Sequence, residues 1–63
     1  MKVKFEINSD TYYTSEVFPS LDKFIQWANN ETGKNYAFHA ISARLKEKTK
    51  IYLGNDATLE IVK

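Results

Sequence analysis

The sequence predicts a small α+β domain whose antiparallel sheet carries helices on one face, in the element order strand, strand, helix, helix, strand, strand. Three observations lead to this prediction. Apolar and charged residues alternate over residues 3–7, apolar residues recur at helical spacing over residues 21–28, and a turn cluster at residues 54–56 separates two extended segments. The 63 residues are the length of one small domain, so we expect a single compact domain over residues 1–63.

The first two predicted strands form a hairpin. Val3, Phe5 and Ile7 alternate with charged residues, which is the period of a strand with one buried and one wet face. Polar residues 8–11 follow as a turn, and a second strand is expected over residues 12–18. This second strand is less clearly amphipathic, because apolar residues occur on both of its faces. One face has Tyr13, Ser15 and Val17, and the other has Tyr12, Thr14, Glu16 and Phe18.

The first predicted helix follows Pro19. Ser20 can cap free backbone N–H groups, and Asp22 lies in the first turn, where a negative charge is favourable. The stripe that faces the core consists of Leu21, Phe24, Ile25 and Ala28. Gly33 is well placed as a left-handed stop. Trp27 lies at the margin of the stripe, so we expect its ring to be only partly covered.

The next segment favours a second helix, from about Tyr36 to Glu47. Its three alanines are strong helix formers, and Ile41 is its one β-branched residue. As a helix, the segment places Phe38, Ile41 and Leu45 on one face. Asn35 is the expected cap.

The same segment also has an interpretation as a strand. Its cations would then line one face as a straight basic row that ends at Tyr52, and the fold would be similar to a β-grasp domain of order ββαββ. The row consists of Arg44, Lys46, Lys48 and Lys50. Whichever structure forms, residues 44–50 carry a net charge of +3 in a chain whose net charge is +1.

A second hairpin is expected at the C-terminal end. Residues 49–53 and 58–62 are extended by residue type, and the cluster at residues 54–56 is the turn between them. This pairing brings Ile51 and Leu53 against Leu59 and Ile61 on the core face.

The residues that carry chemistry are sparse. The chain has no Cys and one His, its eight carboxylates are scattered, and its two glycines are too far apart for a phosphate loop. We therefore expect no catalytic residue, no metal site, no cofactor and no enzymatic activity. No apolar run has the length of a membrane span, so no membrane partner is expected, and the absence of Cys favours the cytoplasm.

The first functional hypothesis is a protein-interaction module that docks on a larger protein as a regulator or inhibitor. Trp27, Tyr36 and Tyr52 are candidate contact residues, because large rings bring contact area at a low cost in rotamer entropy. The basic side chains of residues 44–50 are further candidates. The chain has eight Lys to one Arg and is rich in Asn, a usage typical of AT-rich genes and hence of a low-GC bacterium, its phages or its mobile elements.

Two other kinds of partner remain open. Helix, glycine turn, helix and hairpin resemble the order of a winged-helix motif, in which residues 36–47 would read nucleic acid and residues 50–62 would be the wing. His39, Ser42 and Lys46 would then face the groove. A pI near 8.0 and a single Arg count against this alternative. The third partner is a second copy of the chain, whose acidic N-terminal half could complement the basic segment.

Overall fold

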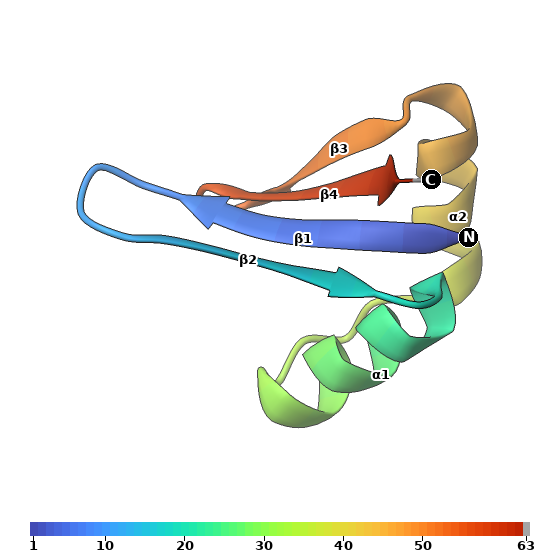
Figure 1. Cartoon of the computed structure of the whole chain (residues 1–63). Helices are drawn as coiled ribbons and strands as arrows, with labels where there is room; N and C mark the ends of the chain where they lie inside the picture. The colour runs from blue at the N-terminus through green and yellow to red at the C-terminus, as the bar shows by residue number, and fades with distance from the viewer. Residues whose placement is uncertain (63) are drawn as a thin grey trace.

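The computed structural model describes residues 1–62, which form a four-stranded antiparallel sheet with two helices on one face (Figure 1). The predicted α+β order is confirmed. The elements are β1 (Lys2–Asn8), β2 (Tyr13–Phe18), α1 (Leu21–Glu31), α2 (Phe38–Glu47), β3 (Lys50–Gly54) and β4 (Ala57–Val62).

The strands lie in the order β2-β1-β4-β3, so the first and last strands are neighbours at the centre of the sheet (Figure 1). Val3 of β1 lies opposite Phe18 of β2 on one side and Ile61 of β4 on the other. β2 and β3 are the two edge strands. Because successive side chains of a strand point to opposite faces, this register puts Val3, Phe5 and Ile7 toward the helices and leaves Lys4 and Glu6 on the open face of the sheet.

The core lies between the sheet and the two helices. Phe24 of α1 is at its centre, and its ring lies 5.4 Å from that of Phe5 and 5.5 Å from that of Phe18, measured between centroids. The buried hydrophobic cluster consists of Val3, Phe18, Leu21, Phe24, Ile25, Ala28, Ile41, Leu45, Ile51 and Leu59. No polar or charged residue within residues 1–62 is buried, so apolar packing is the main stabilising term of this fold.

α1 begins and ends where the sequence predicts. The Ser20 Oγ accepts a hydrogen bond of 3.2 Å from the Lys23 amide, and Asp22 lies in the first turn. Gly33 has φ +70°, a left-handed conformation that costs glycine little. The four residues of the predicted stripe are all buried, and Trp27 is half-buried at its margin.

Residues 38–47 are a helix, so the strand interpretation, with its β-grasp order and straight basic row, is wrong. The helix nevertheless begins at Phe38 rather than Tyr36, and its N-cap is Ala37 rather than Asn35. The cause lies in α1, where the Asn29 side chain bonds both backbone groups of Tyr36. Tyr36 is thereby held outside the helix.

Phe38 shares a face of α2 with Ile41 and Leu45 but differs from them in burial. Ile41 and Leu45 are buried, whereas the Phe38 side chain is 39% exposed. Phe38 lies in the first turn of α2, and its ring packs edge to face on His39, with 5.7 Å between the centroids.

The C-terminal hairpin has the predicted turn. Asn55 and Asp56 have φ of 54° and 64°, the left-handed pair that matches the twist of two-residue hairpins. Ile51 lies directly opposite Leu59, and both are buried. The predicted contact of Ile51 with Leu59 is therefore confirmed, and Leu53 and Ile61 pack against the border of the core.

Candidate functional site

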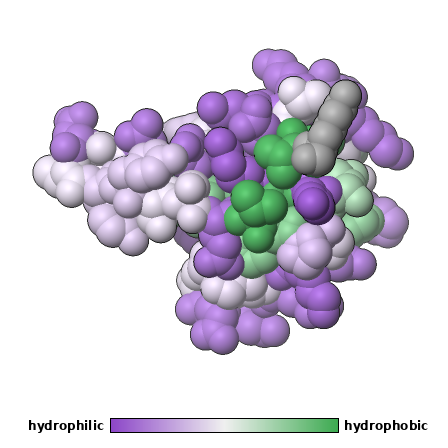
Figure 2. All heavy atoms as spheres, in the orientation of Figure 1, coloured by the Kyte–Doolittle hydropathy of each residue, from purple (hydrophilic) through white to green (hydrophobic). Residues whose placement is uncertain are grey.

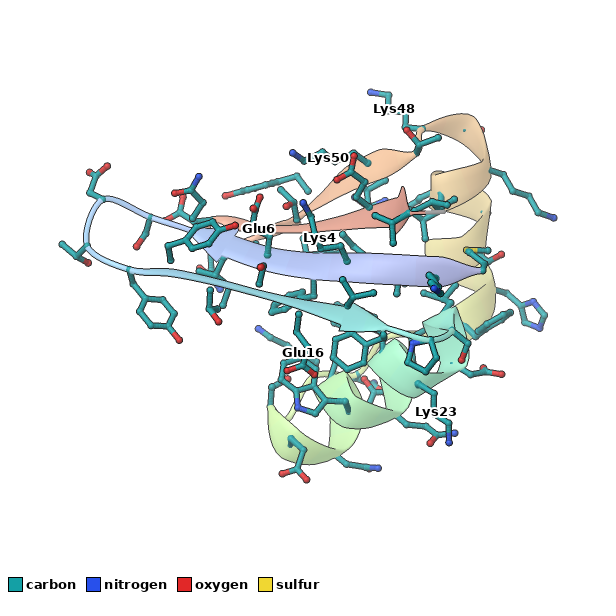
Figure 3. The ribbon with its side chains drawn as sticks, in the orientation of Figure 1. Lys4, Glu6, Glu16, Lys23, Lys48 and Lys50 are labelled. Atoms are coloured by element: carbon teal, nitrogen blue, oxygen red, sulfur yellow. The ribbon has the colours of Figure 1, made fainter. Side chains whose placement is uncertain are left out.

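Most of the basic candidates meet where α2 ends and β3 begins. Arg44, Lys48, Lys50 and Tyr52 line a shallow hollow of about 420 Å³, together with Glu47 and Ile51. We call the first four of these residues the basic corner. Figure 3 shows Lys48 and Lys50 at this end of the sheet, with side chains that extend from the junction of α2 and β3.

Two hydrogen bonds fix the geometry of the basic corner. The Lys48 amide donates to the Arg44 carbonyl at 3.0 Å, which closes the last turn of α2. The Arg44 Nη2 donates to the Tyr52 carbonyl at 2.9 Å. Because β3 is an edge strand, this bond also occupies one of its backbone acceptors and helps to block that edge. The guanidinium still has further N–H donors for a partner.

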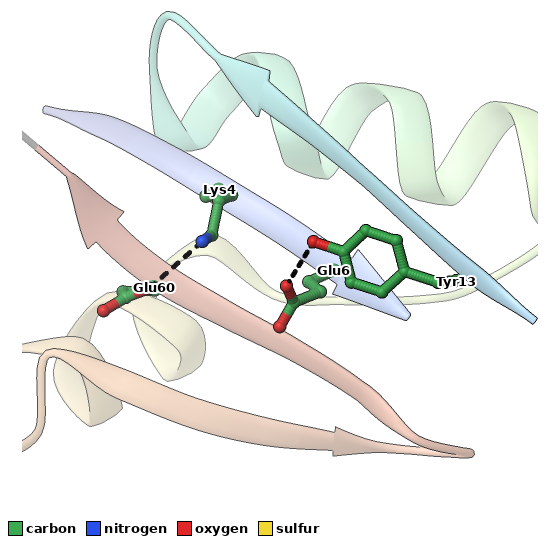
Figure 4. A network of polar contacts seen from close by, with 4 residues as sticks. All are labelled: Lys4, Glu6, Tyr13 and Glu60. Carbon is green, nitrogen blue, oxygen red and sulfur yellow. Dashed lines mark hydrogen bonds and ion pairs between the residues drawn. The ribbon is translucent and has the colours of Figure 1, made fainter. Parts of the chain in front are cut away.

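The cations of the basic corner form no ion pair within the described part of the chain, although Lys50 lies opposite Glu60 in the ladder of β3 and β4. The one ion pair among residues 1–62 joins Lys4 Nζ to Glu60 at 3.8 Å, on the open face of the sheet (Figure 4). Among residues 1–62, Glu47 is the only carboxylate that lines the hollow. The corner is therefore a cationic surface that can attract an anionic group without first breaking an internal ion pair.

Tyr52 completes the corner with an exposed ring. Its side chain is 59% exposed, and its hydroxyl accepts a 3.1 Å hydrogen bond from the Asp56 amide in the hairpin turn. This bond orients the ring along β3, so the aromatic surface beside the cations is preorganised for a contact.

The other candidates lie elsewhere. Lys46 is exposed on α2 but does not line the hollow. Trp27 and Tyr36 border a separate hollow of about 250 Å³ between α1 and the sheet, which shares no lining residue with the basic corner. There the Trp27 ring lies 5.5 Å from Phe5, edge to face, and the Tyr36 ring stacks on Phe24 at 6.1 Å. Both rings thus have structural packing roles.

The open face of the sheet has exposed residues that were not among the candidate contact residues predicted from the sequence. Figure 2 shows this side as largely hydrophilic with a few hydrophobic spots. Tyr13 and Val17 of β2 are 59% and 55% exposed there, and the Tyr13 hydroxyl donates to Glu6 Oε2 at 2.8 Å (Figure 4). The alternation of the strand predicts that Tyr13 and Val17 share one face of β2. It does not predict that this face is the exposed one, because both faces of β2 have apolar residues.

Within residues 1–62 no group of three or more His, Cys, Asp or Glu side chains could hold a metal ion. His39 is exposed on α2 beside Phe38. In the part of the chain that the structure describes, no helix has the length and apolar character needed to cross a membrane.

Comparison with known proteins gives no further guide to the site. No family model matches the chain, and no curated protein or solved structure is significantly similar to it. The fold and the surface define it as a small α+β domain with one cationic corner.

Proposed function

We propose that the chain is a non-enzymatic protein-interaction module that docks on a larger protein, as a regulator or inhibitor encoded by a phage or mobile element. The basic corner is its contact surface, and the partner presents an acidic patch. The observation that carries the proposal is the arrangement of Arg44, Lys48 and Lys50 around one hollow, without an ion pair to any residue in 1–62. Charge complementarity of this kind raises association rates and selects partners.

A nucleic-acid partner has less support. Binders of nucleic acid usually show a basic patch with pI above about 9, whereas this chain has a pI near 8.0. The only Arg is already bonded to the Tyr52 carbonyl. The hairpin that would be the wing has no cation in its Asn55–Asp56 turn. The winged-helix hypothesis remains a prediction, and it is tested in the same experiment.

The test is a pull-down from lysate of a low-GC bacterium, with and without nuclease, using three tagged proteins. They are the parent chain, the corner variant Arg44→Ala/Lys48→Ala/Lys50→Ala, and a control that loses equal charge elsewhere, Lys2→Ala/Lys23→Ala/Lys34→Ala. All six positions are exposed. Far-UV circular dichroism checks that both variants fold, since Arg44 also bonds β3.

We expect one stoichiometric protein partner that survives nuclease, is retained by the control and is lost by the corner variant. Cross-linking from Lys48 and Lys50 should then reach an acidic surface of that partner. Equal capture by the corner variant would show that another surface binds. If the parent chain captured nucleic acid and the corner variant did not, the result would favour the winged-helix hypothesis.

A further inference from the structure

β2 has an open edge. It pairs with β1 and with no other strand among the described residues, whereas the edge of β3 is partly blocked by Arg44. Natural edge strands are usually protected by Lys, Pro or a bulge. The segment Tyr13–Phe18 has neither Lys nor Pro, and its pairing with β1 runs without a register shift.

The hydrogen bonds show which backbone groups of β2 point outward. Ser9 N donates to Tyr12 O at 2.8 Å, one step beyond the pair Asn8↔Tyr13. Bonded and non-bonded pairs alternate along an antiparallel ladder, so Thr14 and Glu16 direct their amides and carbonyls to β1. The amides and carbonyls of Tyr13, Ser15 and Val17 therefore face away from the sheet. In agreement, Asn8, which lies opposite Tyr13, directs its amide to Asp56 rather than to β2.

These outward-facing residues also carry exposed apolar side chains. Tyr13 and Val17 lie at the two ends of the outward set, on the open face of the sheet, and more than half of each side chain is exposed. The central residue, Ser15, is small and exposed. The edge thus has outward-facing backbone groups at all three residues and an uncovered apolar side chain at each end.

We propose that β2 pairs with β2 of a second copy of the chain, antiparallel, about a two-fold axis at Ser15. This register places Tyr13 opposite Val17 of the second copy and Val17 opposite its Tyr13, so that an aromatic ring covers a β-branched side chain twice. Each outward pair, including Ser15 with Ser15 of the second copy, can exchange two backbone hydrogen bonds. On the other face Glu16 lies opposite Thr14.

Neighbouring registers are less favourable. An axis at Glu16 sets two carboxylates directly opposite each other, which is destabilising. An axis at Thr14 sets Val17 opposite Thr11, which lies before β2 begins. The axis at Ser15 is therefore the one that pairs all three outward-facing residues with one another and opposes no like charges.

This interface is independent of the proposed function. β2 and β3 are opposite edges of the sheet, so the dimer leaves both basic corners at its outer ends. The shared edge is one short strand, far smaller than a standard interface, and we expect a weak dimer in rapid exchange with monomer.

The test is sedimentation equilibrium of the purified chain from low micromolar to near-millimolar concentration. The first variant is Ser15→Pro, which removes an amide that bonds nothing in the monomer but lies at the centre of the dimer. Proline is tolerated where the amide of an edge strand faces solvent, so circular dichroism should match that of the parent. We expect the parent to reach dimer mass with rising concentration and Ser15→Pro to remain monomeric.

Two double variants test the register. Tyr13→Lys/Val17→Glu suits the monomer, because the new lysine lies near Glu6 and the new glutamate lies opposite Lys4. It also sets opposite charges together across the dimer, so dimer should form and should weaken with salt. Tyr13→Lys/Val17→Lys sets like charges together and should abolish the dimer. A parent that stays monomeric throughout, or a dimer that persists in Ser15→Pro, would overturn the proposal.

Discussion

The Asn29 side chain bonds the Tyr36 backbone twice, since its Nδ2 donates to the Tyr36 carbonyl at 3.1 Å and its Oδ1 accepts from the Tyr36 amide at 2.9 Å. An amide side chain carries an N–H donor and a C=O acceptor side by side in one plane, so it can bond the amide and the carbonyl of one residue together. The pair closes the loop between α1 and α2 and sets the first residue of α2.

Asn29→Ala should lower the free energy of unfolding by about 2 kcal/mol, because two partly buried hydrogen bonds are lost at about 1 kcal/mol each. The matched control is Asn30→Ala, an exposed neighbour in the same helix, which should change stability by less than about 0.5 kcal/mol. Urea denaturation measures both. If both variants changed the free energy of unfolding equally, the effect would be that of replacing Asn by Ala in a helix, and the two hydrogen bonds would contribute nothing to stability.

Ser20→Ala should cost about 1 kcal/mol, because the Lys23 amide loses its side-chain acceptor at the start of α1. Ser20→Asp keeps an acceptor and adds a charge that is favourable at a helix N-terminus, so it should retain most of the stability. Thermal unfolding followed by far-UV circular dichroism ranks the three proteins. An aspartate variant no more stable than the alanine variant would contradict this role of Ser20.

Asp56→Gly should stabilise the fold by about 0.5 kcal/mol, because glycine adopts a left-handed conformation without the cost that a side chain brings. The hydrogen bonds that Asp56 makes to the Tyr52 hydroxyl and accepts from the Asn8 amide use its backbone, so they survive. Asp10→Gly removes the same charge from the β1–β2 turn and should give no gain. The prediction fails if urea midpoints of both variants move together.

Leu45→Ala should cost about 2–5 kcal/mol, the range for a fully buried leucine, since Leu45 is 1% exposed. A domain of this length has a total stability of roughly 3–9 kcal/mol, so the substitution should remove a large share of that stability and lower the unfolding temperature markedly. Phe38→Ala removes a larger side chain from the same helix, but one that is substantially exposed, and it should cost less. Far-UV circular dichroism distinguishes the two, and the reverse ranking would place Phe38 in the core.

The parts of the fold that sequence reasoning predicts are those fixed by local chemistry. Ser20, the apolar stripe and Gly33 lie within one helix length, and the left-handed turn of the second hairpin is set by its own residues. The first residue of α2 escapes such reasoning because a side chain seven residues away, that of Asn29, holds Tyr36. The strand order could not be predicted from the sequence for a similar reason, because nothing in β1 itself identifies β4 as its second neighbour.

The candidate site also has some features that the local sequence predicts and others that it does not. The charge of residues 44–50 is a property of the sequence, and the helical period then brings Arg44 and Lys48 to one side of α2. The exclusion of Lys46 from the hollow follows from that same period. The remote hollow at Trp27 and the exposed pair Tyr13 and Val17 depend on which face of the sheet the helices cover, which is decided by packing over the whole chain.

The pairing of β1 with β4 has a mechanical consequence. Lys2 lies opposite Val62, so β1 begins and β4 ends at the same end of the sheet (Figure 1). A force applied to the two ends would therefore unzip the central ladder one pair at a time instead of shearing all of its bonds together. The domain would divide into two halves, a hairpin followed by a helix and a helix followed by a hairpin, each with its apolar face uncovered.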